Sequence, residues 1–312
     1  MRIKEVALII SFKCNSNCQH CFFAEKERNS DELMTAQQVK KYLDDMEENL
    51  PQSVLIHGGE PFLFFNKLAK IIKIIQDKNV PIKIITNGFW GSNKIDASKK
   101  LDLLKLLSIK EIIISVDSFH QEFILLDYII NILKLARKKK LKNIYVLSEF
   151  TPKGIDKKYN KQTKQLLFCL KEFDDVINKF YKFPFMTIGK AVNLINANQI
   201  PEKLPNEICS SEGCYGRSFL ELDSIDVYPN GDLIICSGFK IGNANKKPID
   251  KIISEFNINN FKVLSLIGKY GTLALLKEMG KRRCKIKKYL NKCHLCFEAR
   301  KCLKKWYKKE LL

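Results

Sequence analysis

Three cysteines lie close together near the start of the chain, at positions 14, 18 and 21. A structural zinc site usually takes its four ligands as two pairs from separate turns, and His20 is poorly placed to bind one metal together with Cys21. Three thiolates from one loop suit a 4Fe–4S cubane better, because they bind three irons and leave the fourth open to a substrate or cofactor. The loop therefore predicts an iron–sulfur cluster held by Cys14, Cys18 and Cys21.

The chain has 312 residues and eleven cysteines, most of which fall into local groups. Such groups in a reducing compartment indicate metal or redox chemistry in preference to a disulfide framework. The apolar run at residues 5–10 is too short to span a membrane and lacks a cleavage site. We therefore expect a cytoplasmic protein with no membrane segment, and a secreted disulfide protein is the disfavoured alternative.

Lysine and arginine outnumber aspartate and glutamate, 54 to 34, which gives a net charge of +20. Such a surplus favours acidic or polyanionic partners. The lysines alternate with isoleucine and leucine along predicted helices, however, and this pattern is typical of solvated helix faces. A dedicated nucleic-acid site is therefore the less favoured interpretation.

Apolar runs and amphipathic stretches alternate through the first two-thirds of the chain. The apolar runs predict strands at 5–11, 53–57, 82–86, 111–116, 144–149 and 184–188. The amphipathic stretches predict helices at 36–49, 68–77, 97–107, 123–138 and 162–173. Repeated strand–helix units of this kind predict an α/β fold with a parallel sheet.

The polar and glycine-rich residues follow the ends of these strands, and the carboxyl ends of parallel strands share one edge of the sheet. We therefore expect these residues to meet there. Near residue 200 the alternation lapses into a polar segment, so we expect one domain at 1–200 and a cysteine-rich domain with a basic helical tail at 201–312. A Pro-Asn-Gly-Asp turn at 229–232 predicts a hairpin in the second domain.

The spacing Cys-x3-Cys-x2-Cys after the first strand, followed by Gly-Gly-Glu-Pro after the second, resembles the radical S-adenosylmethionine (radical SAM) superfamily. The resemblance covers about residues 1–190 and implies a partial (β/α)6 TIM-like barrel. It implies that S-adenosylmethionine (SAM) binds the open iron and is cleaved by one electron to a deoxyadenosyl radical, which takes hydrogen from a substrate. The protein's share is to bind and orient the reactants.

The resemblance also implies residues that contact SAM. Gly58, Gly59 and Glu60 match the motif that meets the methionyl amino group, where glycines allow close backbone approach and a carboxylate suits an ammonium. Candidates for the methionyl and ribose groups are Asn87, Ser115, Asp117 and Glu149. Gly189 is expected near the adenine. His20 stands where the family usually has an aromatic residue, and its imidazole can still stack.

Residues 213–243 and the later Cys-x2-Cys-x5-Cys resemble the auxiliary-cluster extension called SPASM, or its shorter twitch form. The full pattern has a further cysteine where this chain has Trp306, so we expect one auxiliary 4Fe–4S cluster. Its expected ligands are Cys214, Cys236, Cys293 and Cys296. A structural zinc on the same four thiolates is the alternative.

Four cysteines fall outside these ligand sets. Cys209 and Cys302 are spare or alternative ligands of the auxiliary site. Cys169 is expected to be buried in a helix, and Cys284, among basic residues, to be exposed and incidental.

Proteins with this extension often modify ribosomally made peptides, and segments 85–91, 182–191 and 269–280 resemble radical SAM peptide epimerases. An epimerase must return hydrogen to the α-carbon radical. Some carry a second cysteine directly after the one matching Cys236, where this chain has Ser237. Either Cys209 or Cys302 is then expected to donate the hydrogen, or the radical ends in a thioether or carbon–carbon cross-link.

The expected partners are an acidic precursor peptide as substrate and a reductant protein of the flavodoxin or ferredoxin type. Three alternatives stay open. The enzyme could be a dehydrogenase acting on a small molecule or a radical enzyme modifying tRNA, and the chain could be a non-enzymatic iron–sulfur or zinc regulator. Cleavage of SAM separates the enzymes from the regulator.

Overall fold

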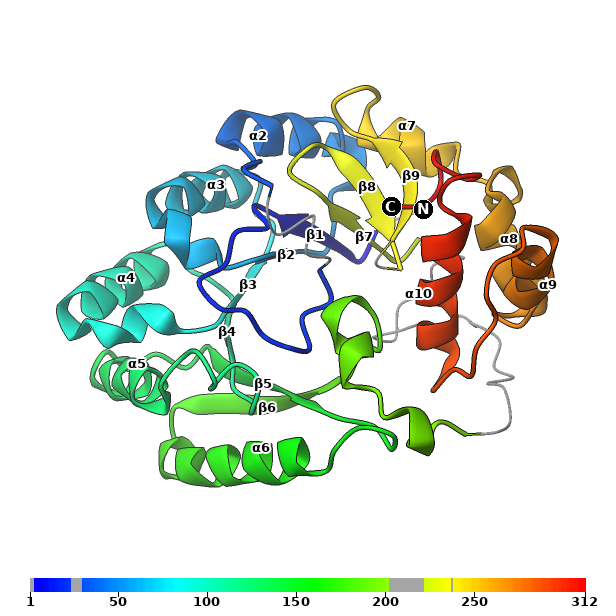
Figure 1. Cartoon of the computed structure of the whole chain (residues 1–312). Coiled ribbons are helices and arrows are strands. Elements are labelled where there is room, and N and C mark those ends of the chain that lie inside the picture. The colour runs from blue at the N-terminus through cyan, green and yellow to red at the C-terminus, as the bar shows by residue number, and fades with distance from the viewer. Residues whose placement is uncertain (1–2, 24–29, 202–221, 237) are drawn as a thin grey trace.

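The computed structural model describes residues 3–23, 30–201, 222–236 and 238–312. These residues fold around one nine-stranded sheet with the order β6-β5-β4-β3-β2-β1-β7-β8-β9 (Figure 1). The strands are β1 (Glu5–Ile9), β2 (Ser53–His57), β3 (Ile82–Thr86), β4 (Glu111–Ser115), β5 (Ile144–Phe150), β6 (Ile177–Pro184), β7 (Ser224–Val227), β8 (Asp232–Ile235) and β9 (Phe239–Asn243). The helices are α2 (Ala36–Asp44), α3 (Phe65–Asp77), α4 (Lys94–Leu106), α5 (Leu126–Lys138), α6 (Lys158–Cys169), α7 (Ile249–Ser254), α8 (Lys262–Tyr270), α9 (Ala274–Lys281) and α10 (Lys292–Leu303).

Strands β1 to β6 pair in sequence order and are all parallel. Helices α2 to α6 connect them and lie along the outer side of the curved sheet (Figure 1). The structure therefore confirms the predicted α/β class and the partial barrel. Within the described residues the sheet does not close, because β6 and β9 stand at its two ends.

Burial on both faces explains why the inner strands are almost purely apolar. All five residues of β4 are buried, and α3 contributes Leu68, Ile71, Ile72 and Ile75, which are fully buried at helical spacing. This packing leaves little room for side-chain substitution. It holds the carboxyl ends of the strands, and the loops that follow them, in fixed positions.

The predicted sixth strand at 184–188 is wrong, since β6 runs over Ile177–Pro184. The apolar Phe-Pro-Phe-Met-Thr-Ile segment looks like a core strand, whereas the true strand carries lysines at 179 and 182. An edge strand tolerates such residues because much of it faces solvent. Seven of the eight residues of β6 are exposed or half-buried, and only Ile177 at its start is buried.

The residues after 221 extend the same sheet beyond β1. β7 pairs parallel with β1, and β8 and β9 follow as antiparallel strands. The predicted hairpin at 229–232 is confirmed: it joins β7 to β8, and Gly231 supplies the positive φ of +83° that its turn requires. In the described part of the chain, none of the helices is both long and apolar enough to cross a membrane.

Candidate active site

A cavity of about 190 Å³ lies at the carboxyl ends of the parallel strands. It is bordered by the loop after β1, the glycines after β2, Asn87 after β3, and the ends of β4 and β5. The predicted site residues that line it are Cys14, Cys18, Cys21, Gly58, Gly59, Asn87, Ser115, Asp117 and Glu149. The structure thus brings together residues that stand far apart in the sequence, at the edge where a parallel sheet collects functional loops.

The cysteine loop is anchored near its start and in its middle. Cys18 is 6% exposed and packs with Phe119 and Tyr159, whereas Cys14 and Cys21 are half-buried. The side-chain amide of Asn87 donates hydrogen bonds to Asn15 Oδ1 at 2.8 Å and to Ser16 Oγ at 3.2 Å. These contacts hold the loop against the end of β3, which explains the position of Asn87 in the site.

The two glycines after β2 let two backbone segments touch. The N–H of Gly59 donates to the carbonyl oxygen of Ser11 at 2.8 Å, and the N–H of Glu60 donates to that of Lys13 at 2.8 Å. A Cβ at Gly59 would lie 2.0 Å from the Lys13 oxygen, and one at Gly58 would lie 2.5 Å from the Ser11 oxygen. Only glycine permits this approach. Gly189 does the same on the other side of the loop, where a Cβ would lie 2.5 Å from the Phe22 oxygen.

Glu60 is buried beneath the cavity and does not line it. Its carboxylate accepts hydrogen bonds from the N–H of Phe62 at 2.9 Å, the hydroxyl of Thr86 at 2.8 Å and the N–H of Asn87 at 2.7 Å. Burial raises the pKa of Glu60 to about 7, although the three hydrogen bonds oppose that shift. The side chain joins the loops after β2 and β3, which places Asn87 beside the cysteine loop.

Asp117 and His120, which follow β4, form a polar group with His20 of the cysteine loop; Asp117 and His20 are buried and His120 is half-buried. Asp117 accepts hydrogen bonds from the backbone N–H groups of Phe119 and His120, and its carboxylate lies 2.9 Å from Nδ1 of His120. His20 stacks on Phe119 with ring centroids 4.5 Å apart. Potential ligand atoms of the three residues lie within 4.8 Å of one another.

Burial and charge set the protonation of this group. Burial by itself would raise the pKa of Asp117, but His120 and His20 hold it well below its usual value. Burial lowers the pKa of His20 to about 4. Burial also lowers the pKa of His120, yet the Asp117 carboxylate outweighs that effect and raises it above its ordinary value. The site therefore favours a carboxylate on Asp117 and a neutral His20 at neutral pH.

Glu149, at the end of β5, lies 3.7 Å from Nε2 of His20. Burial and the nearby Asp117 carboxylate raise the pKa of Glu149 well above its usual value. A cation in the cavity would favour its charged form again. Two carboxyl groups at one wall therefore suit a positively charged ligand.

These residues fit an iron–sulfur cluster and SAM. Three cysteines of one loop supply thiolates at one side of the cavity, and the carboxyl groups suit the cationic groups of SAM. Nδ1 of His20 is buried without a hydrogen-bond partner in the described residues, and such an atom destabilises the fold by about 1–3 kcal/mol. A polar ligand group in the cavity would satisfy it.

The later cysteines lie around α10. Cys293 is half-buried and Cys296 is 8% exposed on this helix. Cys236 is exposed after β8 with a φ of +48°, which is uncommon for a residue other than glycine. A Cβ at Gly238, in the same turn, would clash with Arg300 of α10. The turn therefore packs against the helix that carries the two cysteines.

Two expectations about isolated cysteines are wrong. Cys284 is not incidental, because it forms a disulfide with Cys302 across a Cα–Cα distance of 6.2 Å. Cys169 is exposed, because it is the last residue of α6 and lies on the solvent side of that helix. Cys209, Cys214 and Ser237 lie outside the described residues.

Sequence reasoning missed His120 and Asp226, which also line the cavity. His120 follows Asp117 by three residues, so the Asp-x-x-His spacing was a usable signal. Asp226 lies on β7 and reaches the cavity only because β7 pairs with β1. No local pattern predicts that pairing.

Comparison with known proteins places this site in a family. The model of the radical SAM superfamily matches residues 8–175, more than half of the chain. The Bacillus subtilis protein YydG, whose name assigns it provisionally to peptide biosynthesis, is 27% identical over 228 residues, covering 72% of this chain and 68% of YydG.

Two solved structures share the fold. SuiB of Streptococcus suis, solved with its precursor peptide SuiA, has a TM-score of 0.60 at 17% identity and covers 88% of this chain and 73% of SuiB. The structure of anSMEcpe with bound AdoMet has a TM-score of 0.57 at 14% identity and covers 98% of this chain and 97% of that chain. Because the family model matches residues 8–175, which include the cysteine loop, strands β2 to β5 and most of the residues that line the cavity, the chain belongs to the radical SAM superfamily.

Proposed function

We propose that this radical SAM enzyme modifies a ribosomally made peptide by taking a hydrogen atom, most simply from an α-carbon. The outcome is epimerisation or a thioether or carbon–carbon cross-link. The observation that carries the proposal is the similarity to YydG over most of the chain. The fold shared with SuiB, which was solved with a precursor peptide, is in keeping with it.

The site supports a division of roles. Cys14, Cys18 and Cys21 would hold the cluster, and the backbone at Gly58 and Gly59 would lie beside the methionyl amino group. When bound, the cluster and SAM supply the electron and the deoxyadenosyl radical. The methionyl and ribose groups would be oriented by Ser115, Asp117 and Glu149. Asn87 would fasten the cysteine loop, and Glu60 would hold Asn87 in place. Gly189 would pass near the adenine.

An auxiliary 4Fe–4S cluster on Cys214, Cys236, Cys293 and Cys296 belongs to the same proposal. The packing of the Gly238 turn against α10 supports it for the described ligands, and so does the left-handed backbone of Cys236. All four of these cysteines belong to residues 201–312, which would form the second domain. Cys209 or Cys302 would return hydrogen to the substrate radical, and Cys302 could do so only after reduction of its disulfide with Cys284.

The proposed partners follow from charge and from the need for electrons. The net charge of +20 suits an acidic peptide segment. A flavodoxin- or ferredoxin-type protein would supply one electron for each SAM that is cleaved.

A direct test incubates the reconstituted enzyme, SAM and dithionite in heavy water with candidate precursor peptides, taken from any short reading frames found beside its gene. Inversion at an α-carbon adds one mass unit by deuterium incorporation, and a cross-link removes two hydrogens. We expect one of these shifts in a peptide substrate. If deoxyadenosine forms while every such peptide keeps its mass, and a small molecule or tRNA is altered instead, the peptide assignment is wrong.

A further inference from the structure

The outermost strand of the parallel sheet, β6, offers a binding edge. It pairs with β5 alone among the described strands. Apart from their pairing with β5, residues 178–182 make no backbone–backbone hydrogen bond to the rest of the described residues. One side of this stretch therefore presents N–H and C=O groups that another extended chain could pair with.

The side chains of β6 point alternately to two different places. Phe180 and Lys182 line a groove between β6 and α6. Tyr181 faces the other way, where its ring stacks on Tyr145 of β5 with centroids 5.3 Å apart. A strand added beside β6 would alternate in the same way, with one set of side chains over the groove and the other on the inner face.

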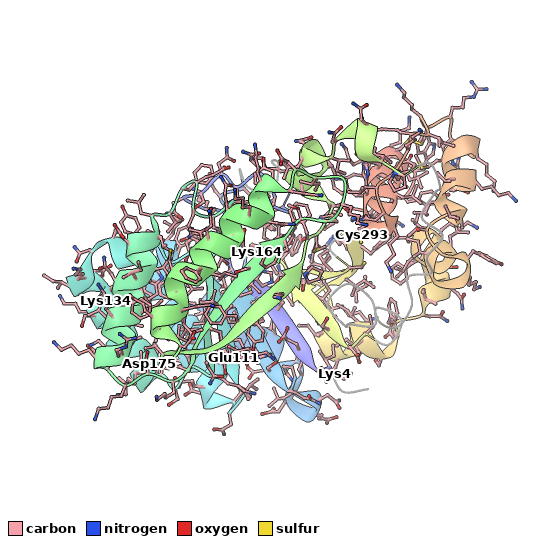
Figure 2. All side chains as sticks on the ribbon, turned by 90° about the horizontal axis from the view of Figure 1, so that it is seen from below. Lys4, Glu111, Lys134, Lys164, Asp175 and Cys293 are labelled. Carbon is pink, nitrogen blue, oxygen red and sulfur yellow. A yellow bond between two sulfur atoms is a disulfide. The ribbon has the colours of Figure 1, made fainter. Side chains whose placement is uncertain are left out.

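The groove is large, partly apolar and basic. It has a volume of about 840 Å³, and its apolar lining comes from Phe150, Leu167, Phe168 and Phe180. Its charged residues are Lys164, Lys171 and Lys182 against a single carboxylate, Asp174. No carboxylate of the described residues pairs with these three lysines. Figure 2 shows Lys164 on α6, beside the outermost strand.

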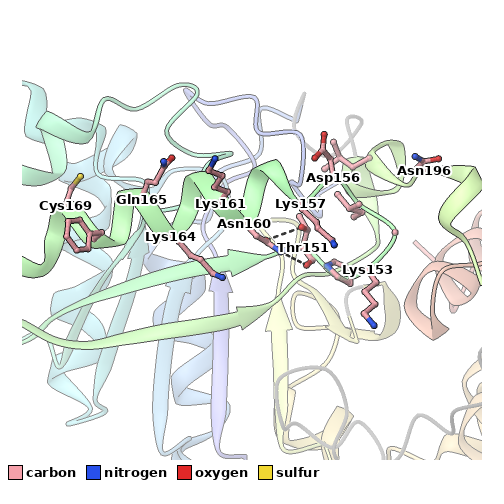
Figure 3. Close-up of a pocket in the computed structure, with 15 residues that line it drawn as sticks. Thr151, Lys153, Asp156, Lys157, Asn160, Lys161, Lys164, Gln165, Cys169 and Asn196 are labelled. Carbon is pink, nitrogen blue, oxygen red and sulfur yellow. Dashed lines mark hydrogen bonds between the residues drawn. The ribbon is translucent and has the colours of Figure 1, made fainter.

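A second groove continues the first one. It has a volume of about 1470 Å³ and runs between α6 and the loop after β5. Lys164 and Phe168 line both grooves. Phe168 is 70% exposed, which is unusual for a phenylalanine. Figure 3 shows Lys153, Lys157 and Lys161 around the second groove, while Asp156 is its single acidic residue.

We propose that residues 178–182 of β6 bind an extended acidic segment of the substrate peptide as an additional strand. Its acidic side chains would lie over the lysines of the groove between β6 and α6. The identity of this segment as substrate rests on the proposed function. Backbone hydrogen bonds would supply affinity, and the lysines and exposed phenylalanine would select acidic and apolar side chains.

Charge decides which strand can pair at this edge. Lys179 and Lys182 are exposed on the strand itself, and lysines at a sheet edge disfavour pairing with an identical edge. A second copy of this chain would bring the same positive charge to the contact. An acidic strand replaces that repulsion with attraction.

The edge also leads toward the active site. In the β5–β6 register, Glu149 lies opposite Phe183, and both line the cavity that contains the three cysteines. A chain paired with residues 178–182 therefore needs only a few further residues, at about 3.3 Å each, to reach the cavity. The proposed binding edge and the site of hydrogen abstraction would be joined by one continuous peptide.

The test measures binding of a fluorescein-labelled ten-residue peptide of alternating glutamate and valine to the full-length reconstituted protein by anisotropy. The double variant Lys164→Glu/Lys182→Glu should raise Kd about tenfold or more, since two attractions become repulsions. The matched variant Lys134→Glu, an exposed lysine on α5 (Figure 2), should change Kd less than twofold. Bound peptide should slow amide hydrogen exchange at 177–184.

Backbone methylation of the probe separates strand pairing from simple charge attraction. Methylating the nitrogens of the glutamates or those of the valines should abolish binding in one case only, because alternate residues pair with β6. The proposal would be overturned by equal effects of the two methylations or by an unchanged Kd in the double variant. It would also be overturned if a ten-nucleotide RNA competed with the labelled peptide as strongly as the unlabelled peptide does. Deoxyadenosine formation without peptide should be the same in all variants, so a failure of the catalytic assignment is recognised separately.

Discussion

Replacing Cys14 with alanine should remove the amino-terminal cluster and reduce SAM cleavage to background. Two remaining thiolates cannot hold a cubane that already lacks a fourth protein ligand. Cys14 lines the cavity beside Asn87 and is half-buried, so the substitution creates little packing loss. Iron content and the visible absorption of the reconstituted protein measure the cluster, and we expect both to fall by the amount of one cluster.

Cys169→Ala is the matched control, because Cys169 is exposed at the end of α6 and does not line the cavity that contains the three cysteines. It should keep the iron content and activity of the parent protein. Full iron content and activity in the Cys14 variant would contradict the assigned ligands. Without iron, the Cys14→Ala variant should unfold at the same temperature as the iron-free parent protein. This comparison separates loss of a ligand from loss of the fold.

Replacing Gly59 with valine should prevent stable folding or destabilise the protein by about 3 kcal/mol or more, as severe overpacking does. The new Cβ would lie 2.0 Å from the carbonyl oxygen of Lys13 and 2.6 Å from that of Phe12. Both are backbone atoms, so relief requires moving the cysteine loop itself. Urea denaturation measures the change in the free energy of unfolding.

Gly280→Ala gives the matched comparison. A Cβ at Gly280 meets no atom within 4 Å, and the residue lies inside α9. Alanine there should stabilise the protein by about 0.5–1 kcal/mol, because glycine loses more backbone entropy in a helix. If Gly59→Val is tolerated as well as Gly280→Ala, the close packing of the two loops does not control the site.

Local periodicity predicted the inner part of the fold well. Strands at 53–57 and 82–86 match β2 and β3 residue for residue, because buried parallel strands are short apolar runs bounded by turn residues. The sixth strand failed for the opposite reason. At a sheet edge the pairing partner supports a strand whose lysines and asparagine face solvent, and sequence alone does not show which strand lies there.

The candidate site was predictable where motif and topology coincide. The cysteine loop, Gly58-Gly59 and Asn87 each follow a strand, so their meeting at one edge follows from parallel pairing. The role of Glu60 did not follow, because its carboxylate points beneath the cavity toward Thr86 and the backbone of Asn87. Such a direction depends on side-chain packing between two loops, which residue spacing does not encode.

Long-range contacts set the remaining limits. The Cys284–Cys302 disulfide joins the segment after α9 to the end of α10, and connectivity of this kind cannot be deduced from cysteine spacing. Asp226 enters the cavity through the pairing of β7 with β1. Both features depend on how the later part of the chain folds back on the barrel.

The proposed radical chemistry depends on three thiolates that would hold a cluster with one open iron, at which SAM would be reductively cleaved. The most direct measurement reconstitutes the full chain without oxygen, adds dithionite and SAM, and quantifies 5′-deoxyadenosine and methionine. We predict equal amounts of the two products, and neither without reductant. Intact SAM alongside a stoichiometric zinc bound to the loop of residues 14–21 would contradict the account.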